Sequence, residues 1–354
     1  MLYENIQQSI TQSLNGGMMT MKKFLSLVLA MMMLCGVCAV SASAEDTIKV
    51  GMVTDVGGIN DQSFNQFAWE GLKKLEEEDP SFKVQYLESK TDADYQTNIN
   101  TFIDEEYDLI ICVGYMLADA TREAAEDNPE QYFAIVDDAS IDLPNVACLT
   151  FAQEQCSYLV GLIAGYMTQT KTVGYIQGMV SETMNLFGVG YCAGVLEACP
   201  EAKILQYNAN AFTDIAGGNT AAKDMITNGA DVIYHAAGGT GLGMLNACEE
   251  EGIWGIGVDS DQAAVTGLNC VLSSALKETG TGAVDIAKSV KEGNFVGGEH
   301  HYTVADGAIG YATTGDHIPA DVLEKVEAAK AAIISGELVV PTSVDEVPAF
   351  TLDD

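Results

Sequence analysis

The chain has 354 residues, a length that suits one large domain or two ordinary ones, and 48% of them are hydrophobic, enough for sizeable cores. Its formal net charge of −35 argues against nucleic acid and anionic membrane surfaces as partners. The 35 glycines and only 7 prolines fit many strand-to-helix turns and do not indicate a disordered chain.

The first 44 residues are predicted to lie outside the folded protein. Residues 21–44, MKKFLSLVLAMMMLCGVCAVSASA, have a basic start, an apolar core and a small-residue cleavage site, the pattern of a secretory signal peptide. Residues 1–20 are expected to be an upstream extension. A transmembrane anchor is the alternative for the apolar core, but the core is short and ends in a cleavage pattern. The mature protein is therefore expected to be exported.

Cysteine usage gives a second indication about the folded part. Two of the nine cysteines lie in the predicted signal peptide, and the remaining seven are an odd number that cannot all pair. Most of these seven have apolar neighbours, so we expect buried free thiols.

Short apolar runs alternate with helical patterns from residue 50 onward. Strands are expected at 50–54, 82–87, 108–113, 132–136 and 146–151, with helices at 91–103 and 117–128 between them. After a helix at 154–167 the pattern restarts, with strands at 172–176, 202–207, 231–235, 253–258, 270–273 and 310–313. Further helices are expected at 186–199, 216–228, 242–251, 277–292 and 320–335. This alternation predicts an α/β protein with two parallel sheets in series.

The first strand-to-helix connection is a candidate ligand site. Gly57 and Gly58 break the strand, and Asn60 or Asp61 can cap the helix that follows. Ligands of open α/β sheets bind at the carboxyl ends of strands, on loops and helix starts of this kind. The candidate residues of this connection are Asn60, Asp61, Ser63, Phe64 and Asn65.

Charged residues at other strand ends extend this candidate site. Asp137 and Asp259 each end an apolar strand, although either could instead be a helix N-cap. Lys277 is expected to start a helix just after a strand, with a solvated surface lysine as the alternative.

The glycine-rich run 238–243, GGTGLG, follows a strand but lacks the Gly-Lys-Ser/Thr ending of a P-loop. We therefore expect a loop at Gly238 whose backbone approaches an uncharged ligand closely. None of the four histidines lies in a metal or nucleophile motif, so catalysis finds little support.

Residues 54–72, TDVGGINDQSFNQFAWEGL, resemble the signature of the basic membrane protein family of ABC-transporter substrate-binding proteins, especially its purine nucleoside receptor branch. Further blocks of resemblance are FAIVDD at 133–138, SETMNLFGVGYCAG at 181–194, GADVIYHAAGGTGLGMLNACEEEGIWGIGVDSDQ at 229–262 and VLSSALK at 271–277. The resemblance implies a type I periplasmic-binding-protein fold, with two doubly wound parallel-sheet lobes joined by three crossovers. It places 45–153 plus 275–297 in lobe one and 154–274 plus 298–354 in lobe two, with hinges near 151–154 and 273–277.

The resemblance also implies a site and a function. Phe64 and Phe187 would stack on a base from opposite lobes, and Asp259, with Lys277, would bind the ribose; without the resemblance, both rings would be read as core. The implied ligand residues are Asp61, Phe64, Asn65, Asp137, Phe187, Gly238, Asp259 and Lys277. Asn60 stands where relatives often have aspartate, which leaves its hydrogen bond open.

By this resemblance the protein is an extracytoplasmic receptor that captures inosine, guanosine or adenosine for an ABC permease and its ATPase. It is expected to be monomeric, with no cofactor and no nucleic-acid partner. Two alternatives stay open: the same scaffold binding a simple sugar, riboflavin or another ribosyl compound, and a nucleoside-cleaving enzyme. Relatives are often lipoproteins, but Leu34 and Val37 precede Cys35 and Cys38 where a small residue is expected, which favours release by cleavage after Ala44.

Overall fold

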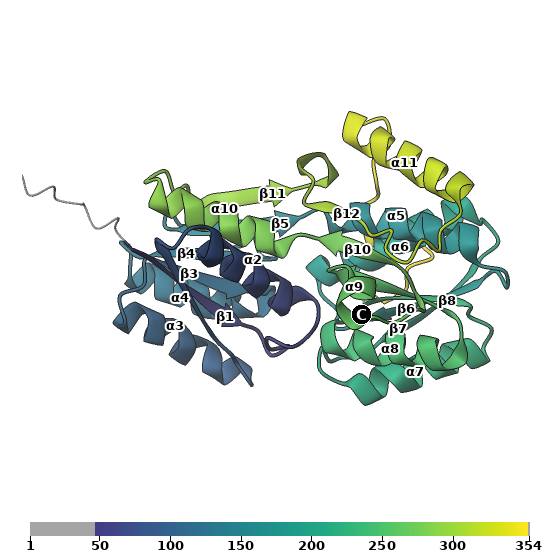
Figure 1. Ribbon diagram of the computed structural model, residues 1–354, viewed down its shortest axis with the longest axis horizontal. Coiled ribbons are helices and arrows are strands. Elements are labelled where there is room, and N and C mark those ends of the chain that lie inside the picture. Colours follow the sequence, from purple (N-terminus) through teal and green to yellow (C-terminus); the bar gives the residue numbers. More distant parts are fainter. Residues whose placement is uncertain (1–46, 353–354) are drawn as a thin grey trace, which may run out of the picture. The chain divides into compact units, whose positions relative to one another are not determined.

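The computed structural model describes residues 47–352 (Figure 1). The predicted upstream extension, the signal peptide and the two lipid-anchor candidates, Cys35 and Cys38, lie outside these residues. Within the described part, no helix combines the length and the apolar character needed to cross a bilayer.

The first sheet has six parallel strands in the order β11-β5-β4-β3-β1-β2. These strands are β1 (Ile48–Thr54), β2 (Phe82–Leu87), β3 (Leu109–Val113), β4 (Tyr132–Val136), β5 (Val146–Phe151) and β11 (Gly298–Tyr302). Its helices are α2 (Phe64–Glu78), α3 (Tyr95–Asp104), α4 (Ala118–Asp127) and α10 (Thr279–Lys291), with short 3-10 turns at Asp92–Asp94 and Tyr115–Leu117. Strand β3, LIICV, is apolar throughout because both of its faces are buried: Ile111 packs into the core on one face and Ile110 into the core on the other.

The second sheet has six strands in the order β12-β10-β9-β8-β6-β7, with only the edge strand β12 antiparallel. These strands are β6 (Thr172–Gln177), β7 (Lys203–Asn208), β8 (Val232–Ala236), β9 (Trp254–Asp259), β10 (Val271–Lys277) and β12 (Ile309–Tyr311). Its helices are α5 (Gln153–Met167), α6 (Glu182–Ala198), α7 (Ile215–Thr227), α8 (Gly238–Glu251), α9 (Gln262–Thr266) and α11 (Ala320–Ser335), with short 3-10 turns at Val304–Asp306 and Val344–Glu346.

Helices α5 and α6 pack with their backbones in close approach, which explains the glycines in both. A Cβ on Gly194 would lie 2.1 Å from the carbonyl oxygen of Tyr158, and one on Gly161 would lie 2.5 Å from that of Tyr191. No larger residue fits at these two positions without moving a helix.

The chain passes between the sheets three times, as expected. The crossings are at Ala152, at Glu278 and along 303–308. They are joined by backbone hydrogen bonds, from Ala152 N to Tyr302 O and from Glu278 N to Ala308 O, each 2.8 Å long. We call the unit built on the first sheet lobe one and the unit built on the second sheet lobe two.

The strand β11 corrects the lobe boundary drawn from the sequence. We expected residues from 298 onward to belong to lobe two, but Gly298–Tyr302 pairs with β5 and extends the sheet of lobe one. No strand was predicted here because GEHHY is polar; an edge strand needs little apolar character, since only one of its sides is paired.

Two further local predictions are wrong. The loop expected at Gly238 is the first turn of a helix, because α8 begins at Gly238 and not at residue 242. Lys277 does not start a helix; it is the last residue of β10, and α10 begins at Thr279.

Candidate functional site

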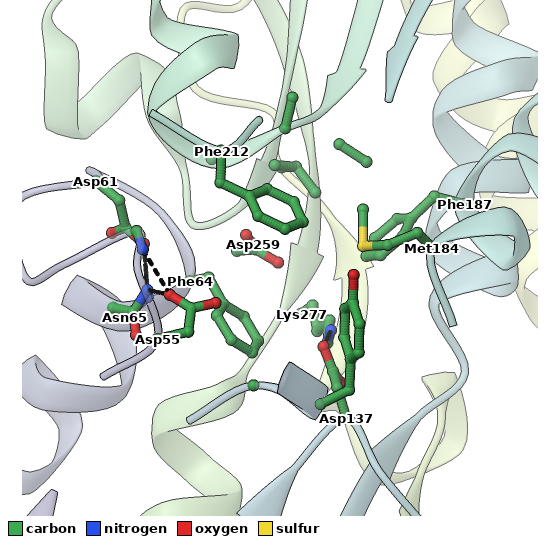
Figure 2. A pocket seen from close by; sticks show the side chains of 17 residues that line it. Asp55, Asp61, Phe64, Asn65, Asp137, Met184, Phe187, Phe212, Asp259 and Lys277 are labelled. Carbon is green, nitrogen blue, oxygen red and sulfur yellow. Dashed lines mark hydrogen bonds and ion pairs between the residues drawn. The ribbon is translucent and has the colours of Figure 1, made fainter. Parts of the chain in front are cut away.

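One pocket, with about 510 Å³ of space not filled by atoms, is lined by 17 residues from both lobes (Figure 2). Its walls come from the carboxyl ends of β1, β3 and β4 in lobe one and of β8, β9 and β10 in lobe two. In lobe one the pocket lies where the strand order reverses, between β1 and β3, the place where open α/β sheets bind ligands.

Asp61 organises the lobe-one wall. Its two carboxylate oxygens accept hydrogen bonds from the backbone N–H groups of Ser63, Asn65 and Gln66, at 2.8–3.1 Å. These N–H groups belong to the start of α2, where a helix has no acceptors of its own. Asp61 therefore does the capping that the sequence predicted, while the residue at the N-cap position itself, Ser63, makes no side-chain cap bond.

Asp55, one residue beyond β1, is joined to this cap through Asn65. The Asn65 side-chain nitrogen donates to Asp55 Oδ1 at 2.8 Å and to Asp61 Oδ2 at 3.1 Å (Figure 2). Burial raises the pKa of Asp55 to about 6, and burial also raises the pKa of Asp61.

Lys277 and Asp137 form an ion pair between Nζ and Oδ2 that is almost fully enclosed: their side chains are 1% and 6% exposed. The pair joins the end of β10 to the end of β4, and therefore lobe two to lobe one. Within the described residues, the other oxygen, Asp137 Oδ1, is buried and has no hydrogen-bond partner. This pair can therefore still accept a hydrogen bond from a molecule in the pocket.

Asp259 ends β9 on the lobe-two side and accepts a 2.5 Å hydrogen bond from Ser63 Oγ of lobe one. Burial raises the pKa of Asp259 to about 7, and the ammonium of Lys277 opposes that shift. Asp259 and Asp137 both have left-handed backbone angles, with φ of 62° and 69°. Aspartate tolerates this conformation better than most residues, and such residues concentrate at functional sites.

Aromatic side chains from both lobes share the pocket. Phe64 and Tyr115 come from lobe one, and Phe187 and Phe212 from lobe two. The Lys277 Nζ lies 4.9 Å from the centroid of Phe64 and 5.2 Å from that of Phe187, so the two rings flank one ammonium group (Figure 2).

Of the ten residues proposed from the sequence, eight line this pocket: Asp61, Phe64, Asn65, Asp137, Phe187, Gly238, Asp259 and Lys277. Ser63 is not a lining residue; its Oγ donates to Asp259 and, at 3.5 Å, to the carbonyl oxygen of Val258, and both of these residues line the pocket. Asn60 is exposed and is not among the lining residues, so the structure does not bring it into the pocket.

Among the wall side chains that sequence reasoning missed are four large or charged ones: Asp55, Tyr115, Met184 and Phe212. Asp55 follows a strand just as Asp137 does, so the same strand-end rule could have found it. The other three lie at the start of a 3-10 turn, near the start of α6 and in the segment between β7 and α7, where no pattern marks them.

The charges of the wall are unbalanced. Four carboxylates, those of Asp55, Asp61, Asp137 and Asp259, face the single ammonium of Lys277. Gly238, at the start of α8, adds backbone N–H donors that have no acceptor within the helix. The site therefore suits an uncharged molecule with several hydrogen-bond donors and an apolar or aromatic face, and it disfavours anions.

Two doubly wound lobes around one such pocket are the architecture of ABC-transporter solute-binding proteins. A solute-binding protein of this class from Aeropyrum pernix is similar in structure, with a TM-score of 0.77 at 26% identity over 85% of this chain and 96% of that one. An arabinose-binding protein from Geobacillus stearothermophilus shares the fold alone, at 14% identity and a TM-score of 0.58.

The family is shown by the sequence. The profile of the Bmp family, described as ABC transporter substrate-binding protein, PnrA-like, matches residues 48–344, and the chain belongs to this family. A CD4+ T-cell-stimulating antigen of Listeria monocytogenes is 38% identical over 90% of this chain and 97% of that protein. The ABC transporter nucleoside-binding protein BmpA of Lactococcus lactis is 37% identical over 85% of this chain and 91% of that protein. Such substrate-binding proteins are extracytoplasmic and work with permease and ATPase subunits.

Proposed function

We propose that this protein binds purine nucleosides between its lobes and delivers them to an ABC permease. The observation that carries the proposal is the wall itself: aromatic rings from both lobes and an excess of carboxylate acceptors meet in one pocket. A nucleoside offers a flat base for the rings and hydroxyl and N–H donors for the carboxylates. The nucleoside-binding relative from Lactococcus lactis supports the same ligand class.

The charged and the aromatic side chains of the pocket have different proposed roles. Asp259 accepts hydrogen bonds from the vicinal ribose hydroxyls, the usual way in which a carboxylate recognises a ribose. Phe64 and Phe187 contact the faces of the base, and stacking of this kind contributes about 1–3 kcal/mol per base. Lys277 holds Asp137 in place and is itself a donor to the sugar. Closure of the lobes, about the crossings at Ala152 and Glu278, brings these groups together around the ligand.

The negative charge of the pocket wall should favour nucleosides over nucleotides as ligands. A phosphate in the pocket would meet four carboxylates and one ammonium, which repel it on balance. We therefore expect nucleoside monophosphates to bind far more weakly than nucleosides.

Thermal denaturation with a ligand panel tests the proposal. Inosine, guanosine and adenosine are compared with ribose, riboflavin and adenosine monophosphate. A nucleoside at 100 times its dissociation constant should stabilise the protein by about 2.7 kcal/mol, while ribose and the monophosphate leave the melting temperature unchanged. A shift with ribose or riboflavin, and none with any nucleoside, contradicts the proposal.

Two further measurements complete the test. Mass spectrometry of small molecules released from purified and then denatured protein identifies a ligand that is retained through purification. Incubation with inosine, followed by an assay for free hypoxanthine, detects cleavage; we expect none, because a receptor returns its ligand unchanged.

A further inference from the structure

A second set of contacts joins the lobes outside the pocket. Gln62, in the loop before α2 of lobe one, has a left-handed φ of 52°. Its backbone carbonyl oxygen accepts two hydrogen bonds from lobe two, from Ser260 Oγ and from Gln262 Nε2, each 3.1 Å long. None of these three residues lines the pocket.

The Gln262 amide is held in one orientation by its surroundings. Its Oε1 accepts a 3.0 Å hydrogen bond from the backbone N–H of Val258 and lies 2.8 Å from His235 Nε2. Because Oε1 is an acceptor in both contacts, His235 must carry its proton on Nε2, and the Gln262 amide nitrogen is directed across the lobe boundary to Gln62.

His235 is fully buried beneath α8, and a Cβ on Gly241 would come within 1.8 Å of its Nδ1. Burial lowers the pKa of His235 to about 4, so the ring is neutral at physiological pH and keeps the role of Nε2 as donor.

We infer that His235, Gln262 and Ser260 form a latch that stabilises the closed lobes independently of which ligand is bound, with His235 acting as a positioning residue for Gln262. The inference rests on the proposed function only for the choice of ligand in the binding test. Because the latch closes on a backbone carbonyl, outside the pocket, it contributes the same factor to the affinity for every ligand. Pocket residues instead change the ratio of affinities between ligands.

The test compares three variants with one matched control. Ser260→Ala and Gln262→Met each remove one donor to Gln62, and His235→Phe removes the group that orients Gln262. Gln206→Met is the control: this half-buried glutamine also donates to a backbone carbonyl, that of Ala349, at 2.6 Å, and accepts from Thr351 N, but within lobe two.

The first readout needs no ligand. Fluorophores on Thr97→Cys of α3 and Thr220→Cys of α7, both exposed and on opposite lobes, report the fraction of closed molecules. Cys199→Ser removes the one described cysteine that is not buried and that the fluorophores would also label. Gln262→Met and Ser260→Ala should lower the closed fraction, while Gln206→Met should leave it unchanged. An equal closed fraction in Gln262→Met, Ser260→Ala and Gln206→Met overturns the latch.

The second readout is calorimetry with inosine and guanosine. Each latch variant should lower the affinity for both nucleosides by the same factor, about two- to tenfold for the loss of one hydrogen bond. The lower affinity should come from faster dissociation of the ligand. A change in the inosine-to-guanosine ratio overturns the inference, because it would place these residues in the ligand site. If the parent protein binds neither nucleoside, the proposed function fails, and the closed fraction still decides the latch.

A double-mutant cycle tests the role of His235. If His235 acts through Gln262, then His235→Phe should lower the closed fraction in the parent protein and have no further effect in a Gln262→Met background. Additive effects of the two changes would show that His235 supports the fold rather than the latch. If His235→Phe does not fold, His235→Gln, which can also donate to Gln262, replaces it and should retain part of the closed fraction.

Discussion

Asp61 and Asp259 are both buried aspartates in the wall of one pocket, yet their surroundings differ. Asp61 receives its hydrogen bonds from N–H groups within five residues of it in the sequence, at the start of α2. Asp259 is held by Ser63, 196 positions away, and lies near the ammonium of Lys277, which itself pairs with Asp137 of the other lobe. The comparison shows that Asp61 builds the local backbone, while Asp259 and Asp137 depend on the lobes being together and keep oxygen lone pairs for a ligand.

The largest expected effect comes from removing the ammonium group of the buried Lys277–Asp137 ion pair, which joins the two lobes. Lys277→Met should destabilise the folded protein by about 3–5 kcal/mol, because it leaves Asp137 buried without a counter-charge. Lys223→Met is the control, since Lys223 pairs with Glu250 at side-chain exposures of 43% and 57%, and a pair this exposed contributes about 1 kcal/mol or less. Chemical denaturation measures both; equal losses would show that the buried pair is not the main contributor.

The second effect compares what Asp61 and Asp259 contribute to the stability of the fold. Asp61→Ala should lower the free energy of unfolding by about 2–3 kcal/mol, because three backbone N–H groups at the start of α2 lose their acceptor. Asp259→Asn should cost much less, since no helix start depends on Asp259. The same denaturation experiment compares them, and a larger loss for Asp259→Asn would reverse the roles assigned here.

The third effect concerns ligand binding, in which Asp259 should matter more than Asp61. Asp259→Ala should weaken nucleoside binding by roughly 10- to 100-fold, since a charged acceptor in a closed cleft contributes about 1.5–3 kcal/mol. It should hardly affect the free base, which has no ribose hydroxyls.

Phe187→Ala is the control for this experiment, because loss of a stacking ring should weaken nucleoside and base alike. Calorimetry with inosine and hypoxanthine measures both variants, provided that hypoxanthine binds the parent measurably. If Asp259→Ala leaves inosine binding intact, Asp259 is a structural residue and the ribose is bound elsewhere.

The last effect, small per pH unit, is a dependence of stability on pH. Because burial raises the folded-state pKa of Asp259 from 3.8 to about 7, the folded protein binds this proton more tightly than the unfolded chain does. Stability from this group is therefore fully present below pH 4 and is lost as the pH rises to about 7. Relative to Asp259→Asn, the parent should lose at most about 1.4 kcal/mol per pH unit in this window. Thermal melts from pH 4 to 7 on both proteins check the sign; a parent that gains stability over this range contradicts it.

Most of the architecture could be predicted because periodicity and apolar runs mark each buried strand. The same rule placed Asp137 and Asp259 at strand ends and would have found Asp55. The pattern could not predict contacts between residues far apart in the sequence. Examples are the pairing of the polar segment 298–302 with β5, and the position of Phe212 and Tyr115 on opposite sides of one pocket. The sequence offered both Asn60 and Asp61 as caps of the next helix. Only the structure shows that the Asp61 oxygens accept from the local N–H groups, which separates a structural carboxylate from one available to a ligand.

The position of β11 has a consequence for the order in which the chain can fold as it is synthesised. The sheet of lobe one contains strands from residues 48–151, yet its edge strand comes from residues 298–302 and the helix α10 from residues 279–291. Lobe two, except for β12, α11 and the segment that follows α11, lies between these segments. The lobe that emerges first from the ribosome is therefore completed only after nearly the whole chain is made, and until then one edge of its sheet is exposed to pairing with other chains.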